Sequence, residues 1–291
     1  MGDPRESIRL ASNILIERLC TSTNLGRVSS FYHTPPVGGP SGQPPFVNAV
    51  VWVNTDLNPW ETWSVVRDVE NELGRVRLQR WEARRIDVDI LLFGDQRIWT
   101  PQLKIPHPRM CMRRFILVPA AEVAPDFVDP VTGASVQQLA ATLGTHATHV
   151  TVLASSDRSA IAIVEEAARL TGARLEQGEA ELATSADGRR TLQCIQGTDL
   201  SDVTVFPPGN LVIYLTPPIA VEGALWEDYH RQAAERLNLC APSNRDSDGL
   251  QSAVISGKVA RYLLASDTPS WATHEIVAAL QAIDCPVEKL T

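Results

Sequence analysis

Two carboxylates stand two residues apart inside an otherwise apolar run. Asp87 and Asp89 lie within residues 86–93, and all the remaining residues of this segment are Ile, Val, Leu or Phe. In an extended chain alternate side chains point to the same side, so two such acids repel each other unless a cation lies between them. Mg²⁺ takes one or two protein carboxylates and leaves its other positions to water and phosphate oxygens. The spacing favours a metal site, and the alternative is an edge strand whose solvent face carries aspartate.

An arginine cluster precedes this acidic pair. Arginine presents a planar fork of N–H donors that suits phosphate oxygens. Acids for a metal and arginines for phosphate, close together in the sequence, indicate a metal–nucleotide site. The alternative is a solvated basic loop. The cluster consists of Arg75, Arg77, Arg80, Arg84 and Arg85.

Several further motifs occur in a fixed order along the first half of the chain. They are SSFYHTPPVG at 29–38, QPPFVNA at 43–49, GRVR at 74–77, RWEARRIDVD at 80–89, IPHPRM at 105–110 and RRF at 113–115. This set resembles the 6-hydroxymethyl-7,8-dihydropterin pyrophosphokinase family over roughly residues 3–145. The resemblance does not extend to residues 146–291.

The resemblance implies a fold and a reaction. The expected fold is α+β, a ferredoxin-like antiparallel sheet with helices. The expected reaction transfers pyrophosphate from ATP to 6-hydroxymethyl-7,8-dihydropterin, which gives the pterin diphosphate and AMP in folate biosynthesis. The alternative is a catalytically impaired scaffold that binds pterin or nucleotide. The enzyme is favoured because a scaffold has no need of paired metal carboxylates, and the chain retains Asp87, Asp89, Arg84, His107 and Arg113 together.

The same resemblance assigns residues to the ATP side of the site. Asp87 and Asp89 are expected to hold two Mg²⁺ ions, with ATP as the co-substrate. The expected catalytic residues are Arg84, Asp87, Asp89 and His107. The expected ATP-binding residues are Glu70, Arg75, Arg77, Ile90, Lys104, His107 and Arg113. From the residues alone, a histidine between two prolines, as His107 is, is usually a surface loop residue.

The pterin side is expected to combine flat stacking faces with an amide. Aromatic rings stack on a heterocycle, and one Asn side chain offers both a donor and an acceptor to the pterin edge. By the resemblance, the pterin-binding residues are Thr34, Pro35, Val37, Phe46, Asn48, Trp81 and Phe115. On spacing alone, the two phenylalanines are also typical of ordinary core aromatics.

The sequence departs from the family pattern in three places. The family's first strand ends in a Gly-Ser-Asn-Leu turn, and this chain begins at Met1 just after that point. Either the start lies upstream of Met1 or the strand has been lost. Glu82-Ala83 stand where Gly-Pro is usual, and Arg85 stands where Thr is usual. The loop before Trp81 is one residue shorter.

Composition limits the class of protein. No run of about 18 apolar residues is present and the N-terminus is polar, so we expect neither a membrane span nor a signal peptide. Five scattered cysteines without C-x-x-C spacing indicate a reduced cytoplasmic protein with no zinc site.

Charge is divided unevenly along the chain. Residues 1–145 carry 15 basic and 15 acidic side chains, so the formal net charge of −8 belongs to residues 146–291. An acidic half is unsuited to nucleic acid, and neither nucleic acid nor membrane is expected as a partner. The shift in charge also predicts a domain boundary near Gly144-Thr145.

Periodicity and turn residues predict the elements of the first half. We expect helices at 4–20, 58–73 and 136–143, strands at 27–32, 46–54 and 86–93, a loop at 35–42, a tight turn at 94–95, and residues 97–99 pairing back on the third strand.

The second half is expected to be an acidic, three-layer α/β accessory domain of unknown function. Strands are expected at 150–153, 210–215 and 259–264, and helices at 159–170, 225–237 and 271–283. The turn at 154–159 has no glycine and no Gly-Lys-Ser/Thr, so a working phosphate loop is not expected. A degenerate relative of a nucleoside or nucleotide kinase and a plain accessory domain both remain open. His146 and His149 are read as solvated linker residues rather than metal ligands.

Overall fold

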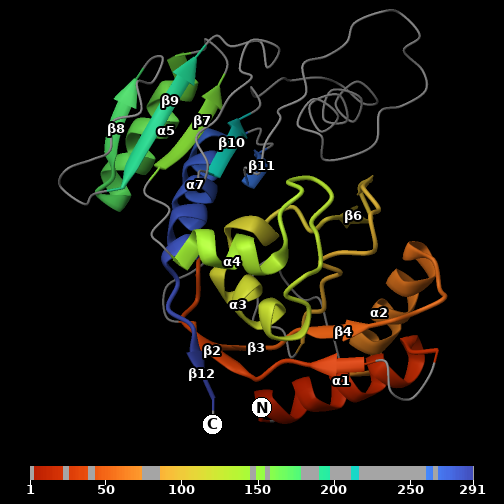
Figure 1. Ribbon diagram of the computed structural model, residues 1–291. Helices are drawn as coiled ribbons and strands as arrows, with labels where there is room; N and C mark the ends of the chain where they lie inside the picture. The colour runs from red at the N-terminus through yellow and green to blue at the C-terminus, as the bar shows by residue number, and fades with distance from the viewer. Residues whose placement is uncertain are drawn as a thin grey trace, which may run out of the picture.

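The computed structural model combines helices, short antiparallel strands and one parallel sheet (Figure 1). It describes residues 3–21, 26–38, 43–73, 86–144, 149–154, 158–177, 190–196, 211–215, 260–264 and 268–290. The first half holds the antiparallel strands and the second half holds the parallel sheet. The fold is therefore a mixture of helix and sheet, as expected. In the described part of the chain, no helix is both long and apolar enough to cross a membrane.

Two capped helices form one side of the first half. α1 (Pro4–Leu19) begins after Asp3, whose carboxylate accepts from the backbone N–H of Arg5. α2 (Pro59–Glu72) begins with a reciprocal capping box between Asn58 and Glu61. Proline in the first turn of each helix sacrifices no hydrogen bond. Both expected helices are confirmed.

α1 and α2 pack on each other around a compact apolar cluster. Buried side chains from both helices enclose Ile86, which opens the segment that carries the two aspartates. The cluster therefore holds the start of that segment against α1 and α2 through Ile86. Its buried members are Ala11, Leu15, Leu19, Val66, Val69 and Ile86.

The expected strands 27–32 and 46–54 are each interrupted, because a bulge divides the hairpin that they form. Its strands are β1 (Gly26–Val28), β2 (Tyr32–Thr34), β3 (Phe46–Asn48) and β4 (Val51–Val53), with β1 paired to β4 and β2 to β3. At the break, Ser29 N–H donates to Val50 O and the Ser29 hydroxyl accepts from Val50 N–H, both at 2.9 Å. A side chain thus takes a hydrogen bond that the ladder would otherwise make, and the ladder is interrupted at this point.

The expected strand at 86–93 is wrong as regular structure. A strand needs a neighbour that takes its backbone hydrogen bonds in a ladder, and this segment has other partners. Val88 N–H donates to the carboxylate of Glu70 on α2 at 3.0 Å, and Leu91 O accepts from His107 N–H at 2.8 Å. The segment is therefore held by a helix side chain and a loop, with no assigned strand.

The turn that follows is confirmed, but the pairing expected after it is not. Gly94 has φ +52°, a left-handed conformation that suits glycine in a tight turn. Beyond it, β5 (Ile98–Trp99) pairs with β6 (Lys104–Ile105) and not with 86–93. A local hairpin forms because Thr100 bonds Leu103 across the tip, its N–H and hydroxyl each at 3.0 Å from Leu103 O.

Two α-helices and a short turn of helix complete the first half. They are the 3₁₀ helix η1 (Met110–Met112), α3 (Arg114–Val123) and α4 (Val136–Gly144). α4 confirms the helix expected at 136–143. α3 was not expected; it contains Pro119, a residue unfavourable inside a helix, and its buried apolar face packs on α4.

The described residues of the second half contain a five-stranded parallel sheet. Its strands are β7 (His149–Ala154), β8 (Arg174–Gln177), β9 (Thr191–Gln196), β10 (Leu211–Leu215) and β11 (Ala260–Leu264), in the order β8-β9-β7-β10-β11. The first strand in sequence is thus central, which explains its continuous burial. β7, β10 and β11 confirm the three expected strands, while β8 and β9 were not expected.

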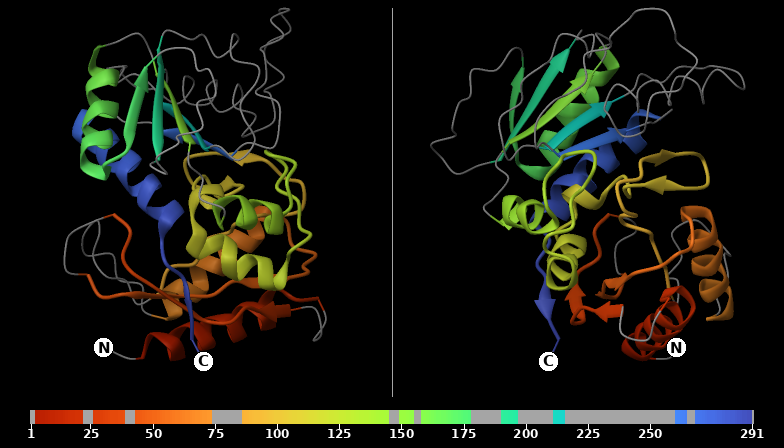
Figure 2. Two further views of the ribbon diagram at one scale, coloured as in Figure 1. Left: turned by 60° about the vertical axis from the view of Figure 1, so that its left-hand side comes forward. Right: turned by 45° about the vertical axis from the view of Figure 1, so that its right-hand side comes forward.

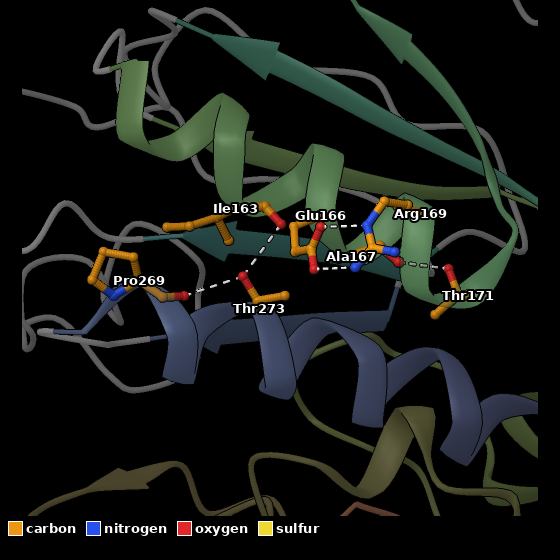
Figure 3. Close-up of polar contacts among 7 residues, drawn as sticks. All are labelled: Ile163, Glu166, Ala167, Arg169, Thr171, Pro269 and Thr273. Carbon is orange, nitrogen blue, oxygen red and sulfur yellow. Dashed lines mark hydrogen bonds and ion pairs between the residues drawn. The ribbon is translucent and has the colours of Figure 1, made fainter.

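Two helices lie together on one face of this sheet (Figure 3). α5 (Arg158–Thr171) and α7 (Pro269–Asp284) confirm helices expected from periodicity. The hydroxyl of Thr273 donates to Ile163 O at 3.5 Å and to Pro269 O at 3.2 Å, so a small polar side chain lets the helices approach. The helix expected at 225–237 lies outside the described residues, and a third layer stays a prediction.

The end of the chain returns to the first half (Figure 2). After α7, β12 (Glu288–Lys289) pairs antiparallel with β2, which makes a three-stranded sheet in the order β12-β2-β3. Leu290 N–H also donates to Phe31 O at 2.8 Å. The C-terminal half therefore contributes a strand to a sheet of the N-terminal half.

The largest apolar core also takes residues from both halves. It joins η1, α3 and α4 to the parallel sheet, α5 and α7. Met110 and Leu117 from the first half and Val152, Ile213 and Ile276 from the second are all fully buried in it. α4 does end at Gly144, close to the boundary expected from charge, but division into two domains stays a prediction.

Glu122 on α3 is hydrogen-bonded to β2, to β12 and to the residue Ser30 just before β2. Its carboxylate accepts from Tyr32 OH at 2.6 Å, Ser30 N–H at 2.7 Å and Lys289 Nζ at 2.8 Å. Burial alone would raise the pKa of Glu122, but the hydrogen bonds from Lys289, Tyr32 and Ser30 outweigh it and lower the pKa to about 2. The ionised carboxylate therefore stabilises the junction of the two halves.

This junction predicts an acid-sensitive part of the stability. Because the pKa of Glu122 is lower in the folded chain than its ordinary 4.5, its contribution is present above about pH 4.5 and is lost as pH falls towards 2. We expect Glu122→Gln to lower the free energy of unfolding by about 1–2 kcal/mol at pH 7. The difference from the unaltered chain should shrink between pH 4.5 and 2 in urea titrations. Glu72→Gln, which breaks the surface pair with Arg18, is the control. A difference that does not change with pH would contradict this prediction.

Candidate functional site

The acidic pair lies on the outer side of an extended segment. Asp87 and Asp89 are exposed, whereas Ile86 is buried and Val88 and Ile90 pack against the α1–α2 cluster. The alternation predicted from sequence therefore holds, although the segment has no strand ladder. Both carboxylates face the same side, as a shared cation requires.

Glu70 anchors this segment from beneath. It lies on α2, is 2% exposed, and accepts from the N–H of Val88, the residue between the two aspartates. A buried carboxylate is costly without hydrogen bonds, so this contact fixes the position of the segment relative to the helix. A contact between Glu70 and the nucleotide stays a prediction.

His107 lies beside the acidic pair. The bond from its N–H to Leu91 O aligns the 105–107 segment with the end of the acidic segment. Its Nε2 is 3.6 Å from Oδ2 of Asp89, and its side chain is 17% exposed. His107 is thus a largely buried residue that faces a metal-ligand candidate, not a solvated loop histidine.

The protonation of His107 follows from its surroundings. Burial and the charges of Arg113 and Arg109 lower the pKa of His107 to about 3, so the ring is neutral at pH 7. Nδ1 accepts a hydrogen bond from the backbone N–H of Arg109 at 3.1 Å. The ring proton must then sit on Nε2, directed towards Asp89.

Three cationic side chains gather around this histidine. Burial, followed by the charge of Arg109, lowers the pKa of Arg113 to about 10, and the same two causes lower the pKa of Lys104. Arg113 therefore remains protonated near neutral pH. The negative charge of Asp89 raises the pKa of Arg113, so the two side chains are close enough to interact electrostatically. A crowd of like charges is stable only where anions compensate it.

Arg109 was not assigned a role from sequence. Oε2 of Glu275 on α7 lies 2.6 Å from Nη2 of Arg109, and the guanidinium stands 5.7 Å from the ring centroid of Tyr262 on β11. One signal could have found this contact. Glu275 is an acid within the apolar positions of the closing helix, and such a residue needs a cationic partner when buried.

The structure brings two of the expected pterin residues into contact. Nδ2 of Asn48 donates to Oγ1 of Thr34 at 2.8 Å across the β2–β3 pair. This bond fixes the amide orientation and leaves the oxygen of Asn48 as an acceptor. Phe46 pairs with Thr34 in register and is 42% exposed, while Pro35 and Val37 follow β2 and are exposed and half-buried.

Phe115 lies next to Arg113, one of the expected ATP-binding residues. It is half-buried in the first turn of α3, and α3 packs against β2 and β3. Its ring centroid lies 5.5 Å from the guanidinium carbon of Arg113. Phe115 therefore lies beside Arg113, on a helix that also packs against the strand that carries Asn48.

Part of the expected site lies outside the described residues. This applies to the arginine cluster at 75–85, Trp81, the substituted positions Glu82 and Arg85, and the turn at 155–157. Their roles stay predictions.

The donor set fits a metal that is shared with a ligand. Within the described ranges, no three His, Cys, Asp or Glu side chains gather to make a protein-only cage. Two exposed carboxylates on one side, with cationic groups beyond them, instead suit Mg²⁺ held jointly by protein and phosphate oxygens. The residues that would hold the metal are Asp87 and Asp89.

Comparison with known proteins gives a consistent match for the first part of the chain. A family model described as 7,8-dihydro-6-hydroxymethylpterin-pyrophosphokinase matches residues 1–125. A 2-amino-4-hydroxy-6-hydroxymethyldihydropteridine pyrophosphokinase from Haemophilus influenzae is 46% identical over 130 residues, which are 45% of this chain and 79% of that protein.

Two further relatives bear the same name. The protein from Bacillus subtilis is 41% identical over 138 residues, 47% of this chain and 81% of that protein. The protein from Synechocystis is 39% identical over 121 residues, 42% of this chain, and this chain spans 61% of its length. Each similarity covers less than half of this chain.

Proposed function

The chain belongs to the 7,8-dihydro-6-hydroxymethylpterin-pyrophosphokinase family, and from this premise we propose that residues 1–145 transfer pyrophosphate from ATP to 6-hydroxymethyl-7,8-dihydropterin. The products are the pterin diphosphate and AMP, and the reaction belongs to folate biosynthesis. The proposed fold of this part is the ferredoxin-like α+β arrangement. The cytoplasm is the proposed compartment, in keeping with the free thiols of Cys20, Cys111, Cys194 and Cys285.

One observation carries this proposal. Asp87 and Asp89 face the same side of a buttressed segment, and His107 directs its Nε2–H towards the second of them. Paired carboxylates near the positive charges of Arg113 and Lys104 match a triphosphate with bound metal, because each partner neutralises the charge of the other. A scaffold that only stacks pterin needs neither.

Asp87 and Asp89 are proposed to hold two Mg²⁺ ions. When bound, the ions neutralise charge on the triphosphate and on the departing AMP. The protein contributes the position of the two carboxylates, because Glu70 and the α1–α2 cluster hold their segment in place before substrate binds.

The reaction itself requires an in-line displacement at the β-phosphorus. The pterin hydroxyl oxygen forms a bond to the β-phosphorus, the bond from that phosphorus to the oxygen shared with the α-phosphorus breaks, and AMP leaves. Asp87 is the proposed acceptor of the hydroxyl proton. The neutral His107 donates one hydrogen bond from Nε2, and Arg113 supplies a permanent positive charge to the phosphates.

The remaining roles follow the proposed division of the site. Thr34, Pro35, Val37, Phe46, Asn48, Trp81 and Phe115 are proposed to bind the pterin. Glu70, Arg75, Arg77, Ile90, Lys104, His107 and Arg113 are proposed to bind ATP, and Arg84 to assist the transfer. The Asn48–Thr34 hydrogen bond supports the pterin assignment, because it fixes an amide beside the exposed ring of Phe46.

The test is formation of AMP that depends on the pterin. Purified full-length chain is incubated with ATP, Mg²⁺ and 6-hydroxymethyl-7,8-dihydropterin, and both products are separated chromatographically. We expect AMP and pterin diphosphate in equal amounts, with neither formed when the pterin or Mg²⁺ is omitted. A chain that binds ATP by calorimetry but forms no AMP would instead support a non-catalytic scaffold.

A further inference from the structure

The two halves of the chain meet at a buried polar contact beside the proposed phosphate site. Nη2 of Arg109 is 2.6 Å from Oε2 of Glu275, and the hydroxyl of Tyr262 donates to the same oxygen at 2.9 Å. Arg109 follows β6 in the N-terminal half, whereas Tyr262 lies on β11 and Glu275 on α7. Residues far apart in the sequence thus form one cluster.

This cluster is buried on its C-terminal side. Glu275 is 4% exposed and Tyr262 is 5% exposed, whereas the side chain of Arg109 keeps 31% of its surface accessible. A carboxylate in such a position is costly unless it is paired and hydrogen-bonded, and both conditions are met here. Burial alone would lower the pKa of Arg109, but Tyr262 and Glu275 more than offset it and keep the guanidinium charged.

The accessible part of Arg109 belongs to the cationic group around His107. Its backbone N–H fixes the tautomer of His107, and its charge acts on His107, Arg113 and Lys104. Without a counter-charge, Arg109 would repel the other two cationic side chains, Arg113 and Lys104. Glu275 supplies that counter-charge from the buried side of Arg109.

We infer that the C-terminal half completes the phosphate-binding end of the pyrophosphokinase site, with Glu275 and Tyr262 as positioning residues that hold Arg109 ready for the triphosphate. The inference rests on the proposed function and deepens it. It also gives residues 146–291 a role that needs no nucleotide site of their own. An arginine fixed before binding loses less side-chain entropy when ATP arrives, so its contacts contribute more to affinity.

The experiment uses the full chain and separates ATP affinity from the other steps. KM for ATP, KM for the pterin and kcat are measured, together with the Kd for α,β-methylene-ATP in Mg²⁺, whose α–β bridge cannot be cleaved. We expect Glu275→Gln to raise KM for ATP and the analogue Kd about 5- to 10-fold, with KM for the pterin unchanged. Tyr262→Phe removes one hydrogen bond and should raise them about 2- to 3-fold.

Two comparisons distinguish positioning from general destabilisation. Asp284 lies on the same helix as Glu275 and forms an ion pair with Arg190, which precedes β9. Asp284→Asn breaks that pair, so it should change the urea midpoint but not KM for ATP. In an Arg109→Gln background, Glu275→Gln should have no further effect on the analogue Kd, because a residue that acts through Arg109 has nothing left to position. In that background it should raise the urea midpoint, since it removes an uncompensated buried charge.

The possible outcomes separate this inference from the proposed function. An unchanged KM for ATP and an unchanged Kd for the analogue in both Glu275→Gln and Tyr262→Phe, with the unaltered chain active, would overturn the inference alone. An equal loss of affinity with and without Arg109 would also overturn it. If Glu275→Gln does not fold, Tyr262→Phe decides. If the unaltered chain binds the analogue but forms no AMP, the proposed reaction is wrong. The Kd for the analogue then still tests whether Glu275 and Tyr262 position Arg109.

Discussion

Replacing Asp87 or Asp89 by asparagine is expected to lower turnover at least about 100-fold, the size of effect seen when one electrostatic contact to a transition state is removed. Each variant keeps the size of the side chain and loses one negative charge facing the proposed cations. Because both aspartates are exposed, the free energy of unfolding should change by no more than about 0.5 kcal/mol. A large loss of activity with little loss of stability is therefore the expected pattern.

The measurement is AMP release by each variant over a range of Mg²⁺ concentrations, with urea unfolding in parallel. Asp95→Asn is the matched control, since Asp95 is also exposed and lies in the turn just beyond the acidic segment. It should keep the activity of the unaltered chain. Turnover near that of the unaltered chain in both Asp87→Asn and Asp89→Asn would remove the metal assignment.

Ending the chain at Gly144 is expected to prevent stable folding of the N-terminal half. Met110, Met112 and Leu117 are buried in the core shared with the parallel sheet, and η1 packs on α7 and β11. Exposing these three side chains alone costs on the order of 5 kcal/mol, comparable to the whole stability of many domains. The same truncation removes β12 and leaves β2 as an unpaired edge.

The readouts are solubility and the urea midpoint of the truncated chain. A chain that ends at Cys285 is the control, because it loses β12 but keeps α7 and the shared core. We expect the control to unfold cooperatively at a somewhat lower urea concentration, and the chain ending at Gly144 to aggregate. A soluble, cooperatively folded 1–144 fragment would show that the first half is an independent domain.

The sequence by itself determined the local elements whose causes are local. The capping residues Asp3 and Asn58, with the prolines that follow them, specify where α1 and α2 begin. Apolar runs specify β7, β10 and β11, because strands buried on both faces need few polar residues. The alternation around Asp87 and Asp89 likewise fixed which side the carboxylates face, and the ordered motifs identified the family.

The tertiary structure decided where backbone partners come from. Residues 86–93 read as a strand, yet the carboxylate of Glu70 and the N–H of His107 take the bonds that a neighbouring strand would provide. Ser29 divides an expected strand in the same way, by bonding Val50 through its side chain. Propensity describes the conformational preference of a segment. A strand also needs a neighbouring strand to take its hydrogen bonds, and the sequence of the segment does not specify that neighbour.

Long-range contacts were equally beyond a reading of the sequence. Arg109 and Glu275 are 166 positions apart in the sequence. β12, at the C-terminal end of the chain, pairs with β2 near its N-terminal end. A charge in an apolar helix shows only that some partner is required. Packing of α7 against η1 and α3 selects that partner, because it is the burial of Met110 and Leu117 that brings Glu275 to Arg109.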